Sequence, residues 1–161
     1  MSKKKKQAKQ KKGYSGVIRN RRARYDYALE EGFRFGLVLN GKQVRAIRDN
    51  HLSLSGSFVT VKDGEMWLMN AKLTLPKTSK QSENLTVSEP IKLLATGREM
   101  QEIEAAKKSG RTVVPTEVLN KTKFIKLRAS IGKGKKKYDK REDKKKRDFE
   151  LKLKRQDLTR I

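Results

Sequence analysis

Arginines and tyrosines are concentrated between residues 20 and 27, where the chain reads Asn-Arg-Arg-Ala-Arg-Tyr-Asp-Tyr. Guanidinium groups donate paired hydrogen bonds to phosphates and stack on bases, and tyrosine rings offer further stacking surfaces. The pattern predicts RNA contact through Arg21, Arg22 and Arg24. For Tyr25 and Tyr27, packing in a hydrophobic core is an equally open interpretation.

A second cationic segment reads Gly-Lys-Gly-Lys-Lys-Lys-Tyr-Asp-Lys-Arg from Gly132 to Arg141. Its two glycines allow close approach to a phosphate backbone. Four acidic residues then each precede a base by four positions, the spacing that supports a helix, as in Glu142 with Lys146. Since few apolar residues follow, we expect a tail that is disordered in free solution and helical on an anionic surface. A permanently solvated helix or a solubility tail is the alternative.

Catalytic chemistry finds little support in the residue types. The chain has no Cys and a single His, so thiolate nucleophiles, disulfides and paired-imidazole metal sites are excluded. Adjacent Glu30 and Glu31 would point to opposite faces of a strand, and His51 has only Asp49 nearby without a supported nucleophile. Gly132-Lys-Gly-Lys lacks the P-loop spacing and the Ser or Thr after Lys. We expect a binding protein that is not an enzyme, without cofactor or metal.

Positive charge is abundant and unevenly distributed. The 161 residues carry 42 Lys and Arg against 18 Asp and Glu, a net charge of +24 that makes a polyanion the expected partner. Residues 1–12 hold seven lysines and no acid, residues 13–120 are nearly balanced, and residues 121–161 hold 18 basic against six acidic residues. We expect a basic disordered arm over 1–16, an RNA-binding domain over 17–131, and a basic tail over 132–161.

Membrane and export signals are missing from the printed sequence. There is no run of about 20 apolar residues, and the Lys-rich N-terminus lacks the apolar segment of a signal peptide. Because the chain has no cysteines, it has none of the disulfides that are typical of secreted proteins, and a reducing, cytoplasmic setting is expected.

Alternating apolar residues predict several strands. Ser57 to Lys62 and Glu65 to Met69 flank Asp63-Gly64, the dipeptide of a type I′ hairpin. Residues 112–119 and 124–131 form a second expected pair, whose later strand exposes a cationic face with Lys126 and Arg128 as candidate RNA contacts. The alternation at Phe33, Phe35, Leu37 and Leu39 extends back to Leu29, Tyr27 and Tyr25, and it points Arg34 outward. Pro115 predicts an edge or start position for its strand.

Helices are expected to be few. Thr96 and Glu99 have capping-box spacing before a helix that stops at Gly110. A shorter helix is expected from Gln43 to Asp49, and residues 74–90, with two prolines, are expected to form a surface loop. Together these elements favour a mainly β fold, an oligonucleotide-binding-like, partly closed β-barrel with a few short helices and a cationic C-terminal tail.

The arm at 20–27, the Gly36 strand leading to Gly41-Lys-Gln-Val-Arg, the Ser57-Phe-Val hairpin and the Gly132 to Arg141 motif together resemble the small protein B family of SsrA-binding proteins. The likeness follows the family's order over nearly the whole chain. It implies a barrel that binds the tRNA-like part of transfer-messenger RNA and takes part in trans-translation, the rescue of stalled ribosomes. It also implies a tail that folds as a helix in the empty mRNA path, and elongation factor Tu as a partner through the RNA. We expect a monomer with one RNA.

The resemblance implies roles for particular residues. RNA contact is implied for Asn20, Arg22, Arg24, Tyr27, Leu94 and Lys126. Stacking in the decoding centre of the small ribosomal subunit is implied for Tyr138, with Asp139, Lys140, Arg141 and Phe149 continuing the tail pattern. The tail site also includes Gly132, Lys133, Gly134, Lys135 and Lys136.

This chain departs from the family's pattern on the barrel face. It has Arg34 where a Glu is usual, Gln43 where a Glu is usual, and Ser88-Glu89-Pro90 in place of an Arg-rich segment. Replacing an acid with Arg34 could exchange a hydrogen bond to a base edge for a phosphate contact.

Two other classes fit the charge pattern. A ribosomal protein would be present on every subunit, and a general single-strand binder of the oligonucleotide-binding class would be displaced equally by any single strand of matching length. The specific interpretation instead predicts a preference for a folded tRNA-like RNA at physiological salt.

Overall fold

The computed structural model describes residues 16–75 and 85–158. The helices and strands follow one another along this part of the chain as β1 Val17–Arg19, α1 Ala23–Asp26, β2 Tyr27–Leu37, α2 Gly41–Arg48, β3 Leu52–Ser53, β4 Phe58–Lys62, β5 Glu65–Met69, β6 Lys72–Leu75, β7 Leu85–Val87, β8 Ile91–Leu94, α3 Gly97–Lys108, β9 Thr112–Leu119, β10 Lys126–Gly134 and α4 Lys137–Leu158.

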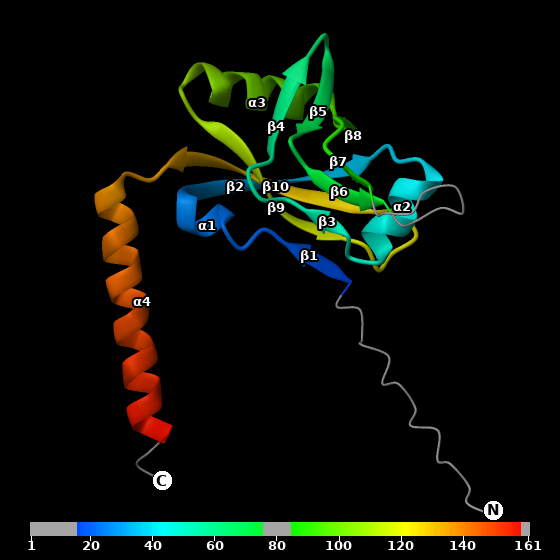
Figure 1. Cartoon of the computed structure of the whole chain (residues 1–161). Helices are drawn as coiled ribbons and strands as arrows, with labels where there is room; N and C mark the ends of the chain where they lie inside the picture. The colour runs from blue at the N-terminus through cyan, green and yellow to red at the C-terminus, as the bar shows by residue number, and fades with distance from the viewer. Residues whose placement is uncertain (1–15, 76–84, 159–161) are drawn as a thin grey trace, which may run out of the picture.

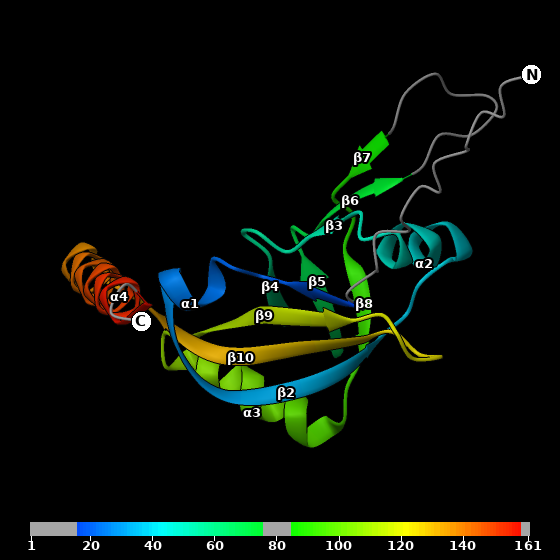
Figure 2. The ribbon, with the colours of Figure 1, turned by 90° about the horizontal axis from the view of Figure 1, so that it is seen from below.

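Six antiparallel strands close into a barrel. Their order is β9-β10-β2-β8-β5-β4, and the pairing of β4 with β9 at Val59 and Val113 closes the ring. β1 pairs with the end of β9, where Val17 is opposite Leu119 and Arg19 is opposite Glu117. β3, β6 and β7 form a small separate sheet. Figure 2 shows β2, β10 and β9 lying side by side as one curved wall of the barrel. The predicted mainly β barrel is confirmed.

The interior of the barrel is filled by apolar side chains, which alternate along its strands with residues that face outward. Phe35, Leu68, Val118 and Leu127 are completely buried, and burial of such side chains supplies the main driving force for closing the ring. Ile103 of α3 is also buried and joins the same core. Consequently the intervening residues of β2, β9 and β10 face outward and are free to carry charge.

The local predictions that depended on turn and cap chemistry are confirmed. Asp63 and Gly64 both have positive φ, 54° and 73°, between strands β4 and β5. Thr96 and Glu99 form a complete capping box at α3. The predicted helix near residue 43 is α2, which begins earlier, at Gly41, because Asn40 forms an additional capping box with Gln43.

The edge position expected from Pro115 is wrong. β9 lies inside the sheet, with β10 on one side and both β1 and β4 on the other. Pro115 is tolerated because it lies at a bulge, where the register with β10 shifts between Arg128 and Ala129. On the other side of β9, Val113 pairs with β4 and Glu117 pairs with β1, and Pro115 lies between these two pairings. Its missing N–H therefore interrupts neither ladder.

Two other expectations need correction. Tyr25 does not begin a strand; it lies in the short helix α1, and β2 begins at Tyr27. Within the expected loop 74–90, residues at both ends pair instead as strands, Leu73 to Leu75 of β6 opposite Leu85 to Val87 of β7. The β6–β7 pair was missed because each strand is short and its partner is not set by a recognisable turn.

The structure describes only part of the three expected segments 1–16, 17–131 and 132–161. Most of the predicted arm, residues 1–15, lies outside the described residues, as do residues 159–161. β10 begins at Lys126 and continues to Gly134, beyond the expected strand end at Ile131. After it, α4 stands away from the barrel and begins beside α1 (Figure 1). Residues 137–158 are helical in the structure. The expectation that the tail is disordered in the free protein and helical on the ribosome stays a prediction.

Candidate nucleic-acid interface

A row of charged side chains crosses four strands on the outer face of the barrel. Arg34 of β2 is the direct partner of Arg128 of β10, which is opposite Glu117 of β9, which in turn is opposite Arg19 of β1. Their sequence neighbours Phe35, Leu127 and Val118 point into the core, so the row faces solvent. Arg34 is exposed, as its alternation predicts.

Glu117 orients two of these arginines. Its carboxylate oxygens lie 3.4 Å from Arg19 Nε and 3.4 Å from Arg128 Nη1. Among the described residues, Arg34 has no ion-pair partner. The row therefore holds three cations against one carboxylate, an arrangement that attracts a polyanion along the direction across the strands.

A second row lies two residues along the same wall. Leu94 of β8 is opposite Gly36 of β2, and Gly36 is opposite Lys126 of β10. Leu94 is 60% exposed, and a Cβ added at Gly36 would lie 3.2 Å from its Cδ1. The structure thus places Leu94 and Lys126, which are 32 positions apart in sequence, on either side of Gly36. Because Gly36 has no side chain, an apolar surface and a cation flank its backbone there.

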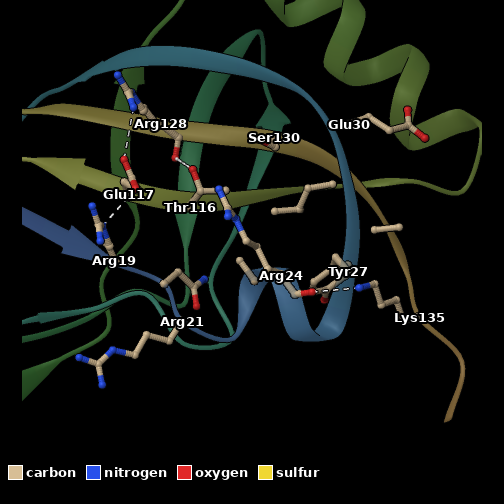
Figure 3. A pocket seen from close by; sticks show the side chains of 14 residues that line it. Arg19, Arg21, Arg24, Tyr27, Glu30, Thr116, Glu117, Arg128, Ser130 and Lys135 are labelled. Atoms are coloured by element: carbon tan, nitrogen blue, oxygen red, sulfur yellow. Dashed lines mark hydrogen bonds and ion pairs between the residues drawn. The ribbon is translucent and has the colours of Figure 1, made fainter. Parts of the chain in front are cut away.

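The arm from Arg19 to Tyr27 forms one side of a groove of about 800 Å³ against β9 and β10. Figure 3 shows Arg24 extending from α1 toward Thr116, while the side chain of Arg21, which also lines the groove, extends in another direction. Lys135 Nζ donates to the Arg24 carbonyl over 3.1 Å on the other side. Cations from β1, α1 and the segment after β10 therefore surround one concave surface, the geometry expected for a phosphate backbone.

Asn20 has a structural task in this arm. Its side-chain nitrogen donates to the carbonyl oxygens of Leu54, over 3.0 Å, and of Pro115, over 2.9 Å. The amide thereby holds the arm against the bulge of β9. Both of its N–H donors are engaged, so any RNA contact of the Asn20 side chain would have to use its oxygen.

The other predicted arm residues differ in exposure. Arg22 is exposed beside the first turn of α1 and does not line the groove. Tyr27 is half-buried and lines the groove where β2 begins. Tyr25 is 38% exposed and lies beneath Lys140, whose Nζ is 5.6 Å from the ring centroid. Tyr27 is therefore the arm tyrosine that is available in the groove.

The tail presents its aromatic residues to solvent. Tyr138 is 69% exposed and Phe149 is 63% exposed, although both lie on α4. Arg141, Lys133 and Lys136 are exposed too. Asp139 accepts from the Lys136 backbone N–H over 3.0 Å and so caps the start of α4. The exposed rings and cations have no partner on the barrel in the described part of the chain, as expected for a surface that binds elsewhere.

Three groups at the start of the tail have shifted proton affinities. A hydrogen bond with Glu142 is the main cause that raises the pKa of Tyr138 above its ordinary value. A hydrogen bond to Asp26 raises the pKa of Lys140, and a hydrogen bond from Lys135 lowers the pKa of Asp143. Each shift favours the form that makes the hydrogen bond, so Tyr138 stays neutral while Lys140 and Asp143 stay charged.

Sequence reasoning missed several residues of this surface. Arg19 and Glu117 enter the row only through the pairing of β1 with β9, which joins segments about 100 positions apart. Asp26 lies within the motif at residues 20–27 but had no expected role, and it pairs with Lys140 of the tail. Its signal in the sequence is its position as the single acid between two tyrosines in an otherwise basic segment.

Metal ligation finds no support in the described residues. They contain no group of three or more His, Cys, Asp or Glu side chains that could hold a metal ion. His51 is exposed. None of the helices in residues 16–75 and 85–158 has both the length and the apolar character needed to cross a bilayer.

Known proteins are similar to this chain in sequence and in fold. The family model for the SmpB protein matches residues 17–158. An SsrA-binding protein of Pseudomonas putida (strain GB-1) is 39% identical over 153 residues, covering 92% of this chain and 94% of that protein. One of Pseudomonas fluorescens (strain SBW25) is 37% identical over the same shares. A chain of a solved structure named "tmRNA-SmpB: a journey to the center of the bacterial ribosome" has a TM-score of 0.61 and 29% identity, with 76% of this chain and 87% of that chain covered.

Proposed function

The chain belongs to the SmpB protein family, and we infer that it binds transfer-messenger RNA and acts with it on the ribosome in trans-translation. One observation in the structure carries this inference. The arginine row, the Leu94 and Lys126 pair and the arm groove occupy one wall of the barrel, whereas the aromatic and basic tail leaves from its end. Two separate binding surfaces on one small protein suit a task that joins an RNA to a ribosome.

We propose that the barrel wall receives the tRNA-like domain of the RNA. Arg24 in the groove and Arg128 and Arg34 on the wall would meet phosphates, which position the RNA without reading its sequence. Tyr27 would offer a stacking surface at the groove, and Leu94 an apolar contact beside Lys126. Asn20 supports this surface mainly by holding the arm in place.

We propose that the tail acts on the small ribosomal subunit. Its exposed Tyr138 would stack on rRNA bases in the decoding centre, with Lys140 and Arg141 beside it, and the later turns with Phe149 would lie in the empty mRNA path. The four-residue spacing of acids and bases helps the helix to persist there, while the scarcity of apolar contacts leaves the distal tail disordered in the free protein. This division assigns residues 17–131, together with Lys135 at the edge of the groove, to the RNA, and the rest of residues 132–161 to the ribosome.

The remaining partners follow from the RNA. We propose that elongation factor Tu joins the complex by binding the same RNA, that one monomer serves one RNA, and that the work takes place in the cytoplasm, where ribosomes are. No covalent step is assigned to the protein. The Thr96 hydroxyl donates to the Glu99 carboxylate over 2.8 Å, but this contact belongs to the capping box of α3.

A competition experiment tests the RNA preference. Labelled tRNA-like domain bound to the full chain is challenged at physiological salt with unlabelled tRNA-like domain or with unfolded single-stranded RNA of equal length. We expect the folded competitor to displace the label at far lower concentration, because the groove and the arginine row are arranged for a fixed backbone shape. Equal displacement by both competitors would favour a general single-strand binder.

A further inference from the structure

Two ion pairs connect the start of the tail to the RNA-binding arm. Lys140 Nζ on α4 lies 2.7 Å from Asp26 Oδ1 at the end of α1. Lys135 Nζ, in the segment before α4, lies 2.6 Å from Asp143 Oδ2 on the second turn of α4. One pair thus holds α4 against α1, and the other holds the segment before the helix against the helix itself.

These cations are the most sheltered of all the ion-paired cations in the described part of the chain. The Lys135 and Lys140 side chains are 20% and 28% exposed, whereas the other ion-paired cations are 40% to 73% exposed. An ion pair that is less exposed is less screened by solvent and salt. The cations of these two pairs are therefore better shielded than those of the other pairs, although the acids Asp143 and Asp26 are 44% and 32% exposed.

Backbone and ring contacts act in the same direction. The Lys135 backbone N–H donates to the Asp26 carbonyl over 2.9 Å, which extends the β2–β10 ladder by one bond beyond Gly134. Lys135 Nζ also donates to the carbonyl of Arg24, the second residue of α1, and Lys140 lies over the Tyr25 ring. By contrast, the described side chains from Lys144 to Leu153 are all exposed. The restraint thus ends at about the second turn of α4.

We propose that Asp26 and Asp143 are positioning residues that latch the first two turns of α4 to α1 and so set the direction in which the tail leaves the barrel. The latch (Asp26, Lys135, Lys140 and Asp143) rests on the proposed function, in which the barrel holds one RNA and the tail enters the ribosome. A fixed exit direction transmits the placement of the RNA on the barrel to the placement of the tail. It also limits the expected disorder of the free tail to residues beyond Asp143.

Lys135 joins this latch to the groove. It lines the groove together with Arg24 and Tyr27, and its ammonium reaches both the Arg24 carbonyl and Asp143. The same side chain therefore contributes to the positive surface that faces the RNA and to the attachment of the tail.

The absence of cysteine makes the test direct. Nitroxide labels are attached to cysteines introduced at Gln101 on α3 and at Lys144, just beyond the latch, both of which are exposed in the structure. Double electron–electron resonance on the full chain without RNA then reports the distribution of distances between barrel and tail. We expect a narrow distribution for the otherwise unchanged protein and a broad one after Asp26→Asn, and likewise after Asp143→Asn.

A matched control and a rescue separate the latch from a change of charge. Asp148→Asn alters the net charge by the same amount on a turn of α4 beyond the latch, and it should leave the distribution narrow. The exchange Asp26→Lys with Lys140→Asp restores opposite charges at the same contact and should narrow it again. Equal distributions for the unchanged protein and for Asp26→Asn would overturn the proposal, as would a broad distribution in the unchanged protein.

Functional assays distinguish failure of the latch from failure of the proposed function. Asp26→Asn should change the Kd for the tRNA-like domain by less than about twofold, yet it should lower ribosome rescue in a reconstituted translation system. Asp148→Asn should lower neither. Unaltered rescue with a broadened distance distribution would show that the exit direction has no function and overturn the proposal. Lack of binding of the tRNA-like domain by the unchanged protein would instead refute the proposed function.

Discussion

Charge reversal at Arg34 should cost the protein two phosphate contacts where simple neutralisation costs one. Arg34 has no ion-pair partner in the described part of the chain, and its direct cross-strand neighbour is Arg128. In Arg34→Gln only the Arg34 cation is lost. In Arg34→Glu the new carboxylate lies opposite Arg128 and attracts it. Arg128 already shares Glu117 with Arg19, so a second acid opposite it compensates the charge that it would otherwise offer to a phosphate. That second cation is then withdrawn from the RNA as well.

The salt dependence of binding measures this difference. Each phosphate contact contributes about 0.9 to the slope of log K against log salt concentration, so the slope should become shallower by about 0.9 for Arg34→Gln and by about 1.8 for Arg34→Glu. Between about 50 and about 200 mM salt, the two variants should therefore lose about 3.5-fold and about 12-fold less affinity than the unchanged protein does. At low salt, we expect Arg34→Gln to bind about tenfold more weakly, ~1.4 kcal/mol.

The assay is a fluorescence anisotropy titration of the labelled tRNA-like domain at several salt concentrations. Lys62→Gln and Lys62→Glu are the matched controls, because Lys62 is an exposed cation at the turn between β4 and β5, and β5 lies across the barrel from β10. Both controls should keep the original slope. The reasoning is refuted if the two Arg34 variants have equal slopes or if the Lys62 variants change the slope as much.

Three further changes test other parts of the account. Gly132→Ala should lower the free energy of unfolding, measured by urea denaturation, by about 1–3 kcal/mol, because the new Cβ would lie 3.1 Å from Leu29 Cδ2. The control Gly134→Ala should be nearly neutral, because no atom lies within 4 Å of its added Cβ. Equal losses in the two variants would contradict this explanation. Ultraviolet titration of the phenol, with Tyr138→Phe as the reference, should find the pKa of Tyr138 above its ordinary value, so that the ring ionises only at higher pH. Glu142→Gln should lower this pKa, because it removes the hydrogen bond to the carboxylate. An unchanged pKa in Glu142→Gln would contradict the hydrogen bond as the cause. Truncation after Lys136 should leave the Kd for the tRNA-like domain largely intact and abolish ribosome rescue, and a matching loss of both would contradict the division of labour between barrel and tail.

Elements with strong local chemistry could be predicted from the sequence. Asp63-Gly64 supplies the positive φ that its hairpin needs, and Thr96 with Glu99 satisfies the first N–H groups of α3 within four residues. Such features depend on neighbours in the chain, so they can be recognised without knowing the fold.

Features that depend on distant partners could not be predicted. Pro115 is acceptable inside the sheet only because a bulge and a gap between β1 and β4 coincide there, and neither is visible in the local sequence. Tyr25 continued the alternation of β2, but the chain turns as α1 before that strand begins.

The candidate site divides in the same way. Lys126 and Arg128 were predicted to face outward because they alternate with apolar residues on one strand, and both are exposed. Arg24 was a candidate because arginines are concentrated in residues 20–27. The assignment of Glu117 to two arginines and of Asp26 to Lys140 depends on strand pairing and on where β10 ends. Acidic side chains in a basic protein gain their role from the cation they meet, which only the fold determines.

The RNA that accompanies the protein tests the central claim most directly. The full chain is purified from its own cells at moderate salt, and the RNA bound to it is sequenced and compared with total RNA. The account predicts strong enrichment of one RNA with a tRNA-like domain and a reading frame, the transfer-messenger RNA. Recovery of ribosomal RNA in equal proportion to ribosomes, or of mixed RNA without enrichment, would contradict it.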